Sequence, residues 1–200
     1  MSDRVFNHTH AHKLEDPERL KWMPTTEVLS RLHLAKGAHI ADIGAGTGYF
    51  AIPMAKAVGD AGHVLAIDLQ PEMLQLLQQK LDEPDAPVNI SPRRGSASKL
   101  PLEDRIVDLV FYANIWHELE EDDQDAALWE AARVAVPGGK IAILDWRRDK
   151  QSPPGPPQDH RIAAETIMNL LQTNGCHRVA CYNIGEFSYL VTAELPQDVG

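Results

Sequence analysis

Short apolar segments of strand character alternate with amphipathic, helix-length segments from about residue 25 onward. Consecutive parallel strands need a crossover connection, usually a helix, so this alternation predicts an α/β fold with a parallel sheet covered by helices. We expect a single domain over residues 25–200, preceded by an N-terminal arm or cap over residues 1–24. The strands are expected at residues 39–43, 64–68, 88–90, 106–113 and 140–145.

The helices between these strands show apolar stripes and recognisable end signals. Thr25 or Thr26 can cap the first helix, Gly37 follows its end, and Pro71 lies near the first position of a later one. A turn is expected at Pro137-Gly138-Gly139, before the fifth strand. The predicted helices cover residues 25–34, 49–58, 71–81 and 124–136.

The C-terminal part of the chain departs from this alternation. The proline-rich segment at residues 152–157 can be neither helix nor central strand, so it predicts an extended loop. A helix is expected at residues 162–174, followed by strands at 179–184 and 187–193. Because the connection at Gly185 is short, these last two strands should form an antiparallel hairpin.

The turn after the first strand carries the clearest ligand signal. It reads Asp42-Ile43-Gly44-Ala45-Gly46-Thr47-Gly48 and leads into a helix. Closely spaced glycines at a helix N-terminus expose backbone amides to a ligand, and the helix dipole adds a positive potential. This arrangement predicts a site for an adenosine-bearing cofactor. A tight strand-to-helix turn that binds no ligand is the alternative.

Two further positions narrow the choice of cofactor. The dinucleotide fingerprint requires a third glycine at position 49, which is tyrosine here, and this argues against NAD. Asp68 ends the second strand 20 residues after Gly48, a placement that suits a carboxylate accepting both ribose hydroxyls. A nucleotide-cofactor oxidoreductase stays open as the less favoured hypothesis.

Together these features resemble the class I S-adenosylmethionine-dependent methyltransferases, over about residues 38–145. The resemblance implies a Rossmann-like, doubly wound, seven-stranded sheet of order 3-2-1-4-5-7-6 with the last strand antiparallel. It also implies S-adenosyl-L-methionine as the cofactor and methyl transfer to a small molecule as the reaction. The terminal hairpin of that fold agrees with the one expected from the turn at Gly185.

The family's motifs, carried over position by position, mark a cofactor site. The first motif would surround the methionine part of the cofactor, and Asp68 matches the ribose-binding acid. Leu69 would pack on the adenine, and Ser96 stands where many relatives have an aspartate that contacts the adenine amino group. Residues 114–117 match the segment between cofactor and acceptor. The cofactor-binding residues implied are Asp42, Gly44, Ala45, Gly46, Gly48, Asp68, Leu69, Ser96, Ala97 and Asn114.

Within that superfamily the chain is most similar to the branch that contains the ubiquinone/menaquinone-biosynthesis and arsenite methyltransferases. That branch methylates diverse small molecules. Arsenite methylation relies on several cysteines at the acceptor site, whereas Cys176 and Cys181 both fall near the C-terminal strands, so arsenite is disfavoured. The motifs behind this similarity are Leu100-Pro101-Leu102, Val107-Asp108, His117-Glu118-Leu119 and Pro137-Gly138-Gly139.

Methyl transfer from a sulfonium needs alignment of donor and acceptor, and a base only where the acceptor carries a proton. His117 and Glu118, beyond the fourth strand, are the candidates for that base. The structural alternative is that Trp116 and Leu119 pack while His117 and Glu118 cap the next helix. Asp145, at the end of the fifth strand, should also face the crevice or pair with an arginine.

Two basic groups outside these motifs have open roles. His8, His10 and His12 would share one side of an extended segment and could hold a divalent metal, but no carboxylate or cysteine in a recognised spacing joins them. No metal site is therefore assigned, and a mobile arm that folds over the cofactor is the alternative. Arg161 would suit an anionic acceptor or cap the following helix.

The charge balance limits the possible partners. The chain has 19 basic and 29 acidic residues, a formal net charge of -10, and no basic run longer than a pair, so a nucleic-acid partner is disfavoured. Residues 1–14 contain no apolar stretch of signal or membrane-span length, which predicts a cytoplasmic protein without a membrane span. A protein that binds the cofactor or a metal without catalysis remains the non-enzymatic alternative; the acceptor and the oligomeric state are left open.

Overall fold

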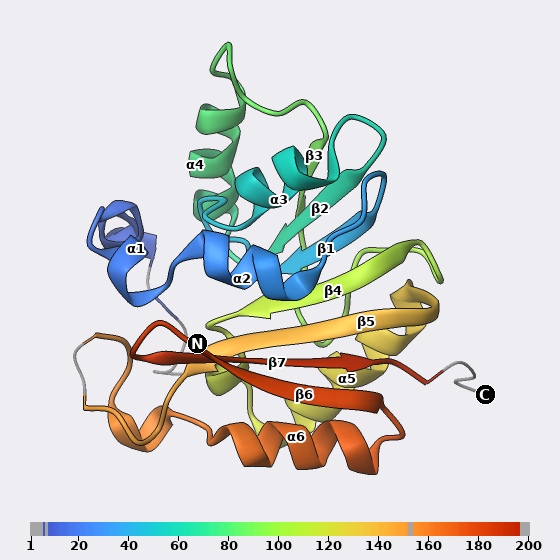
Figure 1. Ribbon diagram of the computed structural model, residues 1–200. Helices are drawn as coiled ribbons and strands as arrows, with labels where there is room; N and C mark the ends of the chain where they lie inside the picture. Colours follow the sequence, from blue (N-terminus) through green and yellow to red (C-terminus); the bar gives the residue numbers. More distant parts are fainter. Residues whose placement is uncertain (1–5, 7, 152–153, 197–200) are drawn as a thin grey trace.

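A seven-stranded sheet forms the centre of the protein, with the strand order β3-β2-β1-β4-β5-β7-β6 (Figure 1). This computed structural model describes residues 6, 8–151 and 154–196, with the backbone alone at residues 12, 13 and 15. The predicted α/β class and strand order are confirmed. The strands are β1 (His39–Ile43), β2 (His63–Asp68), β3 (Ile90–Arg94), β4 (Val107–Ala113), β5 (Ala135–Trp146), β6 (His177–Ile184) and β7 (Ser188–Glu194).

Strand direction follows the same prediction. The pairs β1 with β2, β1 with β4, β2 with β3, and β4 with β5 are all parallel. In contrast, β7 runs antiparallel to both β5 and β6. The short connection at Gly185 requires this of β6 and β7. The last strand is therefore inserted between its two neighbours in the sheet.

Helices cover both faces of this sheet, and each face has its own apolar core. Side chains from α2 (Thr25–Leu32), α3 (Ala51–Val58) and α4 (Pro71–Leu81) pack in one core. Those from α5 (Glu121–Val134) and α6 (Ala164–Thr173) pack in the other. Figure 1 shows α3 and α4 beside β1 to β3, and α5 and α6 beside β5 to β7. Central strands buried on both sides explain the continuous apolar runs in the sequence.

The third strand differs from its prediction. We expected it at residues 88–90, but β3 spans Ile90–Arg94 and Val88 is 92% exposed. The paired residues include Pro92, which breaks the apolar pattern by which a strand is recognised. A proline is tolerated there because β3 is the edge of the sheet and pairs only with β2.

The turn predicted at Pro137-Gly138-Gly139 is also absent, because these residues lie inside β5. The register of β4 against β5 jumps from Val107 opposite Ala135 to Leu109 opposite Lys140. Gly138 has a φ of +76°, a conformation that glycine adopts without strain. The three residues therefore form an irregularity within one long strand.

Helix ends differ from the predictions by a few residues. The helix expected at 25–34 ends at Leu32, since His33 adopts a left-handed conformation with φ of +49°. The one expected at 124–136 is α5, which starts three residues earlier and gives its last two predicted residues to β5. The helices expected at 49–58 and 162–174 are two or three residues shorter in the structure.

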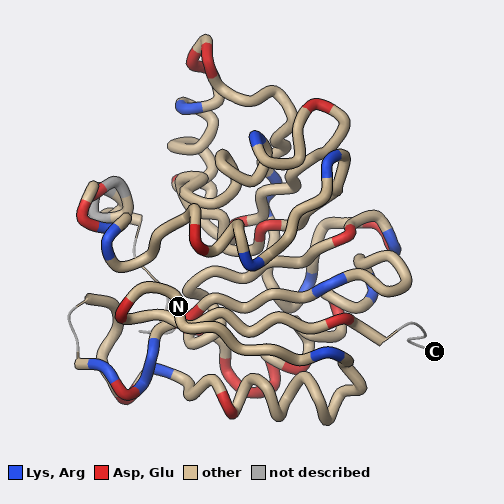
Figure 2. Tube along the Cα trace, viewed as in Figure 1, with Lys and Arg blue, Asp and Glu red and all other residues tan. Residues whose placement is uncertain are grey.

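The strand order reverses between β1 and β4, which places a crevice at the carboxyl ends of the parallel strands. The N-terminal segment contains a 3-10 helix, η1 (His8–Glu15), and the short α1 (Arg19–Trp22). Figure 2 shows Lys and Arg dispersed among acidic residues, without one continuous basic face in that view. Within the described residues, every helix is too short or too polar to cross a lipid bilayer.

Candidate functional site

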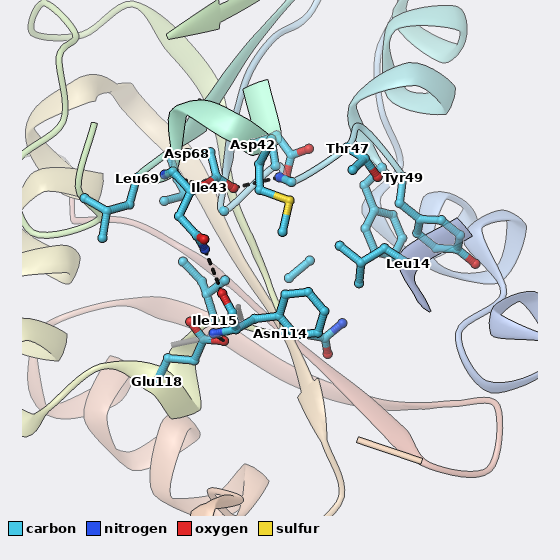
Figure 3. Close-up of a pocket in the computed structure, with 18 of the residues that line it drawn as sticks. Leu14, Asp42, Ile43, Thr47, Tyr49, Asp68, Leu69, Asn114, Ile115 and Glu118 are labelled. Atoms are coloured by element: carbon cyan, nitrogen blue, oxygen red, sulfur yellow. Dashed lines mark hydrogen bonds between the residues drawn. The ribbon is translucent and has the colours of Figure 1, made fainter. Parts of the chain in front are cut away.

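The crevice at the carboxyl ends of the strands holds a cavity of about 720 Å³. Figure 3 shows Asp42, Asp68 and Leu69 on one side of this cavity and Asn114 and Glu118 on the other. Of the residues predicted to bind a cofactor, all but Gly48 line it. Segments far apart in the sequence are therefore brought together around one space.

The glycine-rich turn keeps its backbone open toward the cavity. Gly44 and Gly46 have φ values of +73° and +55°, in the left-handed region. A Cβ on Gly44 would lie 2.4 Å from Cγ2 of Ile115, so a side chain there would collide with the segment after β4. Glycine at position 44 is thus needed both for the turn and for this close approach.

Gly48 serves packing, because a Cβ at this position would lie 2.5 Å from Cδ1 of Leu77 in α4. Its φ of +87° likewise requires glycine. The sequence could not distinguish this role from ligand contact, because both need the same residue. Thr47 beside it lines the cavity and is 2% exposed, although it is not among the residues that the family motif marks.

Asp42 is a buried carboxylate without the usual compensation. It is 1% exposed, and neither of its oxygens makes a hydrogen bond of ordinary geometry with the described residues. Burial, together with the negative charge of Asp68, raises the pKa of Asp42 from 3.8 to about 7, although the nearby backbone amide of Ala51 and the charge of Arg19 oppose the shift. An uncompensated acid on the cavity wall costs stability and suits a cationic ligand group that would compensate it.

We expect Asp42→Asn to stabilise the ligand-free protein at pH 8 and to change little at pH 4. Folded Asp42 holds its proton up to about pH 7, whereas unfolded Asp42 releases it near 3.8, so the folded state loses stability as pH rises between these values. The asparagine variant should gain roughly 2–4 kcal/mol at pH 8. Urea unfolding at both pH values measures this, and an equal effect at both would contradict it.

Asp68 links the turn that follows β1 to the turn that follows β2. Its carboxylate accepts hydrogen bonds from the backbone amides of Gly46 at 2.8 Å and Gln70 at 2.9 Å. Burial raises its pKa, and these amide bonds counteract the rise. Each carboxylate oxygen can accept a further hydrogen bond, so ribose hydroxyls remain compatible with this arrangement.

The residues predicted around the adenine also line the cavity. Leu69 is 47% exposed and Ala97 is buried, and both line the cavity. The Ser96 hydroxyl lies 3.0 Å from the Ser98 hydroxyl and accepts the Ser98 backbone amide. Ser96 therefore holds its own loop together as well as lining the cavity.

Asn114 lies at the end of β4 in a conformation that few non-glycine residues adopt, with φ of +58°. Its amide nitrogen lies 2.9 Å from the sulfur of Met23, while its carbonyl oxygen is buried without a partner among the described residues. Strained residues with unmatched polar groups concentrate at ligand sites. This observation supports the cavity as a binding site.

His117 forms a buried pair with Asp145 from β5. The ring Nδ1 lies 2.7 Å from the Asp145 carboxylate, which also accepts the backbone amides of His117 and Trp146. Asp145 is completely buried and is not among the residues that line the cavity, so neither role predicted for it agrees with the structure: its side-chain partner is His117, not an arginine. Burial lowers the pKa of His117, but the charge and hydrogen bond of Asp145 outweigh burial and raise it overall.

Glu118 is half-buried and lines the cavity. Its Oε1 accepts the backbone amide of Phe6 at 3.0 Å. Burial raises the pKa of Glu118 to about 7, and the neighbouring His117 opposes this shift. The alternative that His117 and Glu118 cap the next helix is wrong, since α5 begins at Glu121 and no side chain caps it.

These features match known proteins. A family model described as a methyltransferase domain matches residues 40–139, which is half of the chain. A structure described as a SAM dependent methyltransferase from Aquifex aeolicus is 31% identical, with a TM-score of 0.87, and the match covers 96% of this chain and 100% of that one. The chain belongs to the class I S-adenosylmethionine-dependent methyltransferases.

Other relatives of this methyltransferase carry more specific names. The demethylmenaquinone methyltransferase of Lactiplantibacillus plantarum is 34% identical over 125 residues, which is 62% of this chain and 52% of that protein. The chain thus spans about half the length of the curated relatives it matches. A Haemonchus contortus phosphoethanolamine N-methyltransferase with bound S-adenosyl-L-methionine shares the fold, with 16% identity and a TM-score of 0.72. S-adenosylmethionine is accordingly the cofactor of this methyltransferase, and the dinucleotide alternative finds no support.

The N-terminal segment of the chain reaches the cavity through contacts that no local sequence motif predicts. The Gln70 side chain accepts the backbone amide of His8 and donates to the backbone carbonyl of Phe6. The Arg19 guanidinium lies 3.9 Å from the centre of the Tyr49 ring, whose hydroxyl donates to Met23. Cavity-lining residues from this segment are Phe6, Leu14, Asp16, Arg19 and Trp22.

The histidine arm does not have the extended form on which the metal hypothesis depended. His8 and His10 lie in η1, where the His8 ring faces Gln70 at 3.3 Å. The side chain of His12 lies outside the described residues. Among the residues that are described, no three His, Cys, Asp or Glu side chains gather as metal ligands.

Arg161 is 2% exposed and binds the proline-rich loop. Its guanidinium donates to the backbone carbonyls of Arg147, Lys150, Pro154 and Pro156. Neither role predicted for it, contact with an anionic acceptor or capping of the next helix, agrees with this geometry. Instead it holds Pro154 and Pro156 against the cavity that they line.

Proposed function

We propose that this protein transfers the methyl group of S-adenosylmethionine to a small, uncharged and largely apolar acceptor. The observation that carries the proposal is the set of apolar and aromatic residues that other segments than the glycine-rich turn contribute to the cavity wall. These include Phe6, Trp22, Leu119, Trp146 and Pro156, which come from the N-terminal segment, β5, and the loops after β4 and β5. Apolar and aromatic walls of this kind suit a flat ring compound.

The charges around the cavity support the same acceptor class. Four acidic side chains line it, from Asp16, Asp42, Asp68 and Glu118, against one guanidinium, from Arg19. These complement a donor that carries a sulfonium and an ammonium group, and they disfavour an anionic acceptor. Arg161 faces away onto backbone carbonyls.

Two further observations narrow the acceptor. Cys176, just before β6, and Cys181, within β6, are free thiols, and neither lines the cavity. A metalloid acceptor held by cysteines is therefore not supported. The curated relatives named demethylmenaquinone methyltransferases point to quinone-type compounds. We therefore place hydroquinones and other ring hydroxyl compounds first among the acceptors.

Within this proposal the predicted cofactor residues receive defined roles. Asp42 and Asn114, each with unmatched oxygens, would face the methionine part of the cofactor, and Asp68 would accept the ribose hydroxyls. Leu69 and Ala97 would flank the adenine. Residues 1–24 would act as a cap, since the described part of this segment already lines the cavity.

We expect S-adenosylmethionine to raise the melting temperature of the protein and S-adenosylhomocysteine to accumulate when a suitable acceptor is added. NADH should leave the melting temperature unchanged, because only a ligand of the folded state stabilises it. The acceptor panel consists of 1,4-dihydroxynaphthalene, hydroquinone, catechol, a primary amine and a thiol. Absence of S-adenosylhomocysteine with all of them, despite cofactor binding, would favour a non-catalytic cofactor-binding protein.

A further inference from the structure

The pair formed by His117 and Asp145 has the arrangement of a base and the residue that positions it. Three hydrogen bonds fix the Asp145 carboxylate: from the His117 ring, from the His117 backbone amide and from the Trp146 backbone amide. His117 is 5% exposed and lines the cavity. Because Nδ1 is bound to Asp145, Nε2 is the ring nitrogen left for a ligand.

The backbone around this pair explains why it is rigid. Asp145 lies near the end of β5 and is paired with Tyr189 of β7, so the neighbouring strand holds its backbone. His117 lies in the short 3-10 helix η2 (Trp116–Glu118), whose Trp116 is completely buried against Tyr112. Both partners therefore stand on packed elements.

We infer that His117 is the base that removes a hydroxyl proton from the methyl acceptor, and that Asp145 is the positioning residue that keeps Nε2 free for this step. The inference rests on the proposed methyl transfer and adds that the acceptor carries an ionisable ring hydroxyl. In the step, Nε2 of His117 takes the proton of the acceptor hydroxyl, while the hydroxyl oxygen forms a bond to the methyl carbon. The carbon–sulfur bond breaks, and its electron pair stays on sulfur as the neutral thioether of S-adenosylhomocysteine.

His117 fits this step better than its neighbour Glu118. One oxygen of Glu118 is occupied by the Phe6 backbone amide, which holds the N-terminal segment, whereas the His117 ring has one nitrogen without a described bond. The Asp145 carboxylate also stabilises the imidazolium formed when the proton arrives. The carboxylate can stabilise the imidazolium while it keeps its hydrogen bonds to the backbone amides of His117 and Trp146.

The charged groups around His117 determine the pH dependence. Burial and Arg161, from the loop before α6, oppose protonation of the ring. Asp145 from β5 and Glu118 from η2 favour it, and they raise the pKa of His117 above the ordinary 6.5. The rate should therefore fall as pH decreases through this raised pKa, because the protonated ring cannot act as a base.

The test compares His117→Asn and Asp145→Asn with His177→Asn, which changes an exposed histidine at the start of β6. Asparagine at position 117 can still donate to Asp145, so the buried carboxylate keeps a partner. With 1,4-dihydroxynaphthalene as acceptor, kcat should fall roughly 100-fold or more in the first two variants and stay unchanged in the third. The Kd for S-adenosylmethionine, measured by calorimetry, should remain unchanged in all three.

Two further measurements separate a positioning role from a structural one. In Asp145→Asn, the acid limb of the kcat profile should move to lower pH, because the charge that raises the pKa of His117 is lost. Nitrogen NMR of the S-adenosylhomocysteine complex should show a proton on Nδ1 of His117 in the wild type. This readout needs no methyl transfer.

Each contrary result has a distinct meaning. Retained kcat in His117→Asn, or a proton on Nε2 in place of Nδ1, would overturn the inference. If NMR shows the expected pair but no acceptor is methylated, the proposed function fails and the catalytic role of His117 fails with it. In that case only the orientation of the ring by Asp145 would stand.

Discussion

Arg161→Met is expected to destabilise the protein by roughly 3 kcal/mol, because it removes a buried guanidinium that donates hydrogen bonds to four backbone carbonyls. Methionine fills much of the space but donates no hydrogen bond. The carbonyls of the loop would then have to open to water. For a chain of this length, such a loss corresponds to a decrease in melting temperature of about 6–12 °C.

The matched control is Arg147→Met, in the same region of the chain. Arg147 is partly buried and forms an ion pair with the exposed Asp149 at 2.7 Å, so its replacement should cost less than about 1 kcal/mol. Differential scanning calorimetry of both variants provides the comparison. Equal melting temperatures for the two variants would show that Arg161 does not hold the loop in solution.

The loss of Arg161 should also affect the acceptor more than the donor. Pro154 and Pro156, which Arg161 holds, line the cavity beside Trp146. A loosened wall at this position should raise KM for the acceptor while the Kd for S-adenosylmethionine changes little. This part of the expectation depends on the proposed function, whereas the stability loss does not.

Asp68→Ala is expected to weaken the binding of S-adenosylmethionine by roughly 1–3 kcal/mol, or about 5- to 150-fold in Kd. The variant leaves the ribose hydroxyls without their acceptor and frees the backbone amides of Gly46 and Gln70. Isothermal titration calorimetry measures the change directly.

Asp60→Ala serves as the control, since Asp60 is an exposed carboxylate in the turn after α3. It should bind S-adenosylmethionine as the wild type does. Thermal unfolding of ligand-free Asp68→Ala tests whether the turn still folds. Unchanged affinity in a folded Asp68→Ala protein would remove Asp68 from the cofactor site.

Strong local patterns were sufficient for much of the fold. The strand at residues 39–43 and the helix at residues 71–81 match the structure in full, because an apolar run and a proline-led amphipathic stripe leave few alternatives. The third strand failed because an edge strand containing Pro92 buries little and so has no apolar pattern. The turn expected at residues 137–139 failed because a glycine-rich irregularity within a strand has the same local signature as a turn.

The site likewise divides into residues that a local pattern predicted and contacts that no local pattern could predict. Chemistry carried by a compact motif, such as the turn from Asp42 to Gly46, was recognisable from residue types and spacing alone. The contact of Phe6 with Glu118, 112 residues apart, had no such signal. Nor did the partner of Asp145, since an arginine was nearer in sequence than His117.

The sequence by itself determined the α/β class, because that depends on hydrophobic period. The motif at the glycine-rich turn, with Asp68, carried the family resemblance, and that resemblance implied the sheet order and the donor. The tertiary structure decided which groups meet across that turn. It separated Gly48, which packs on Leu77, from Gly44 and Gly46, which face the cavity. It also joined His117 to Asp145, because two strands that lie side by side in the sheet bring their ends together whatever their distance along the chain.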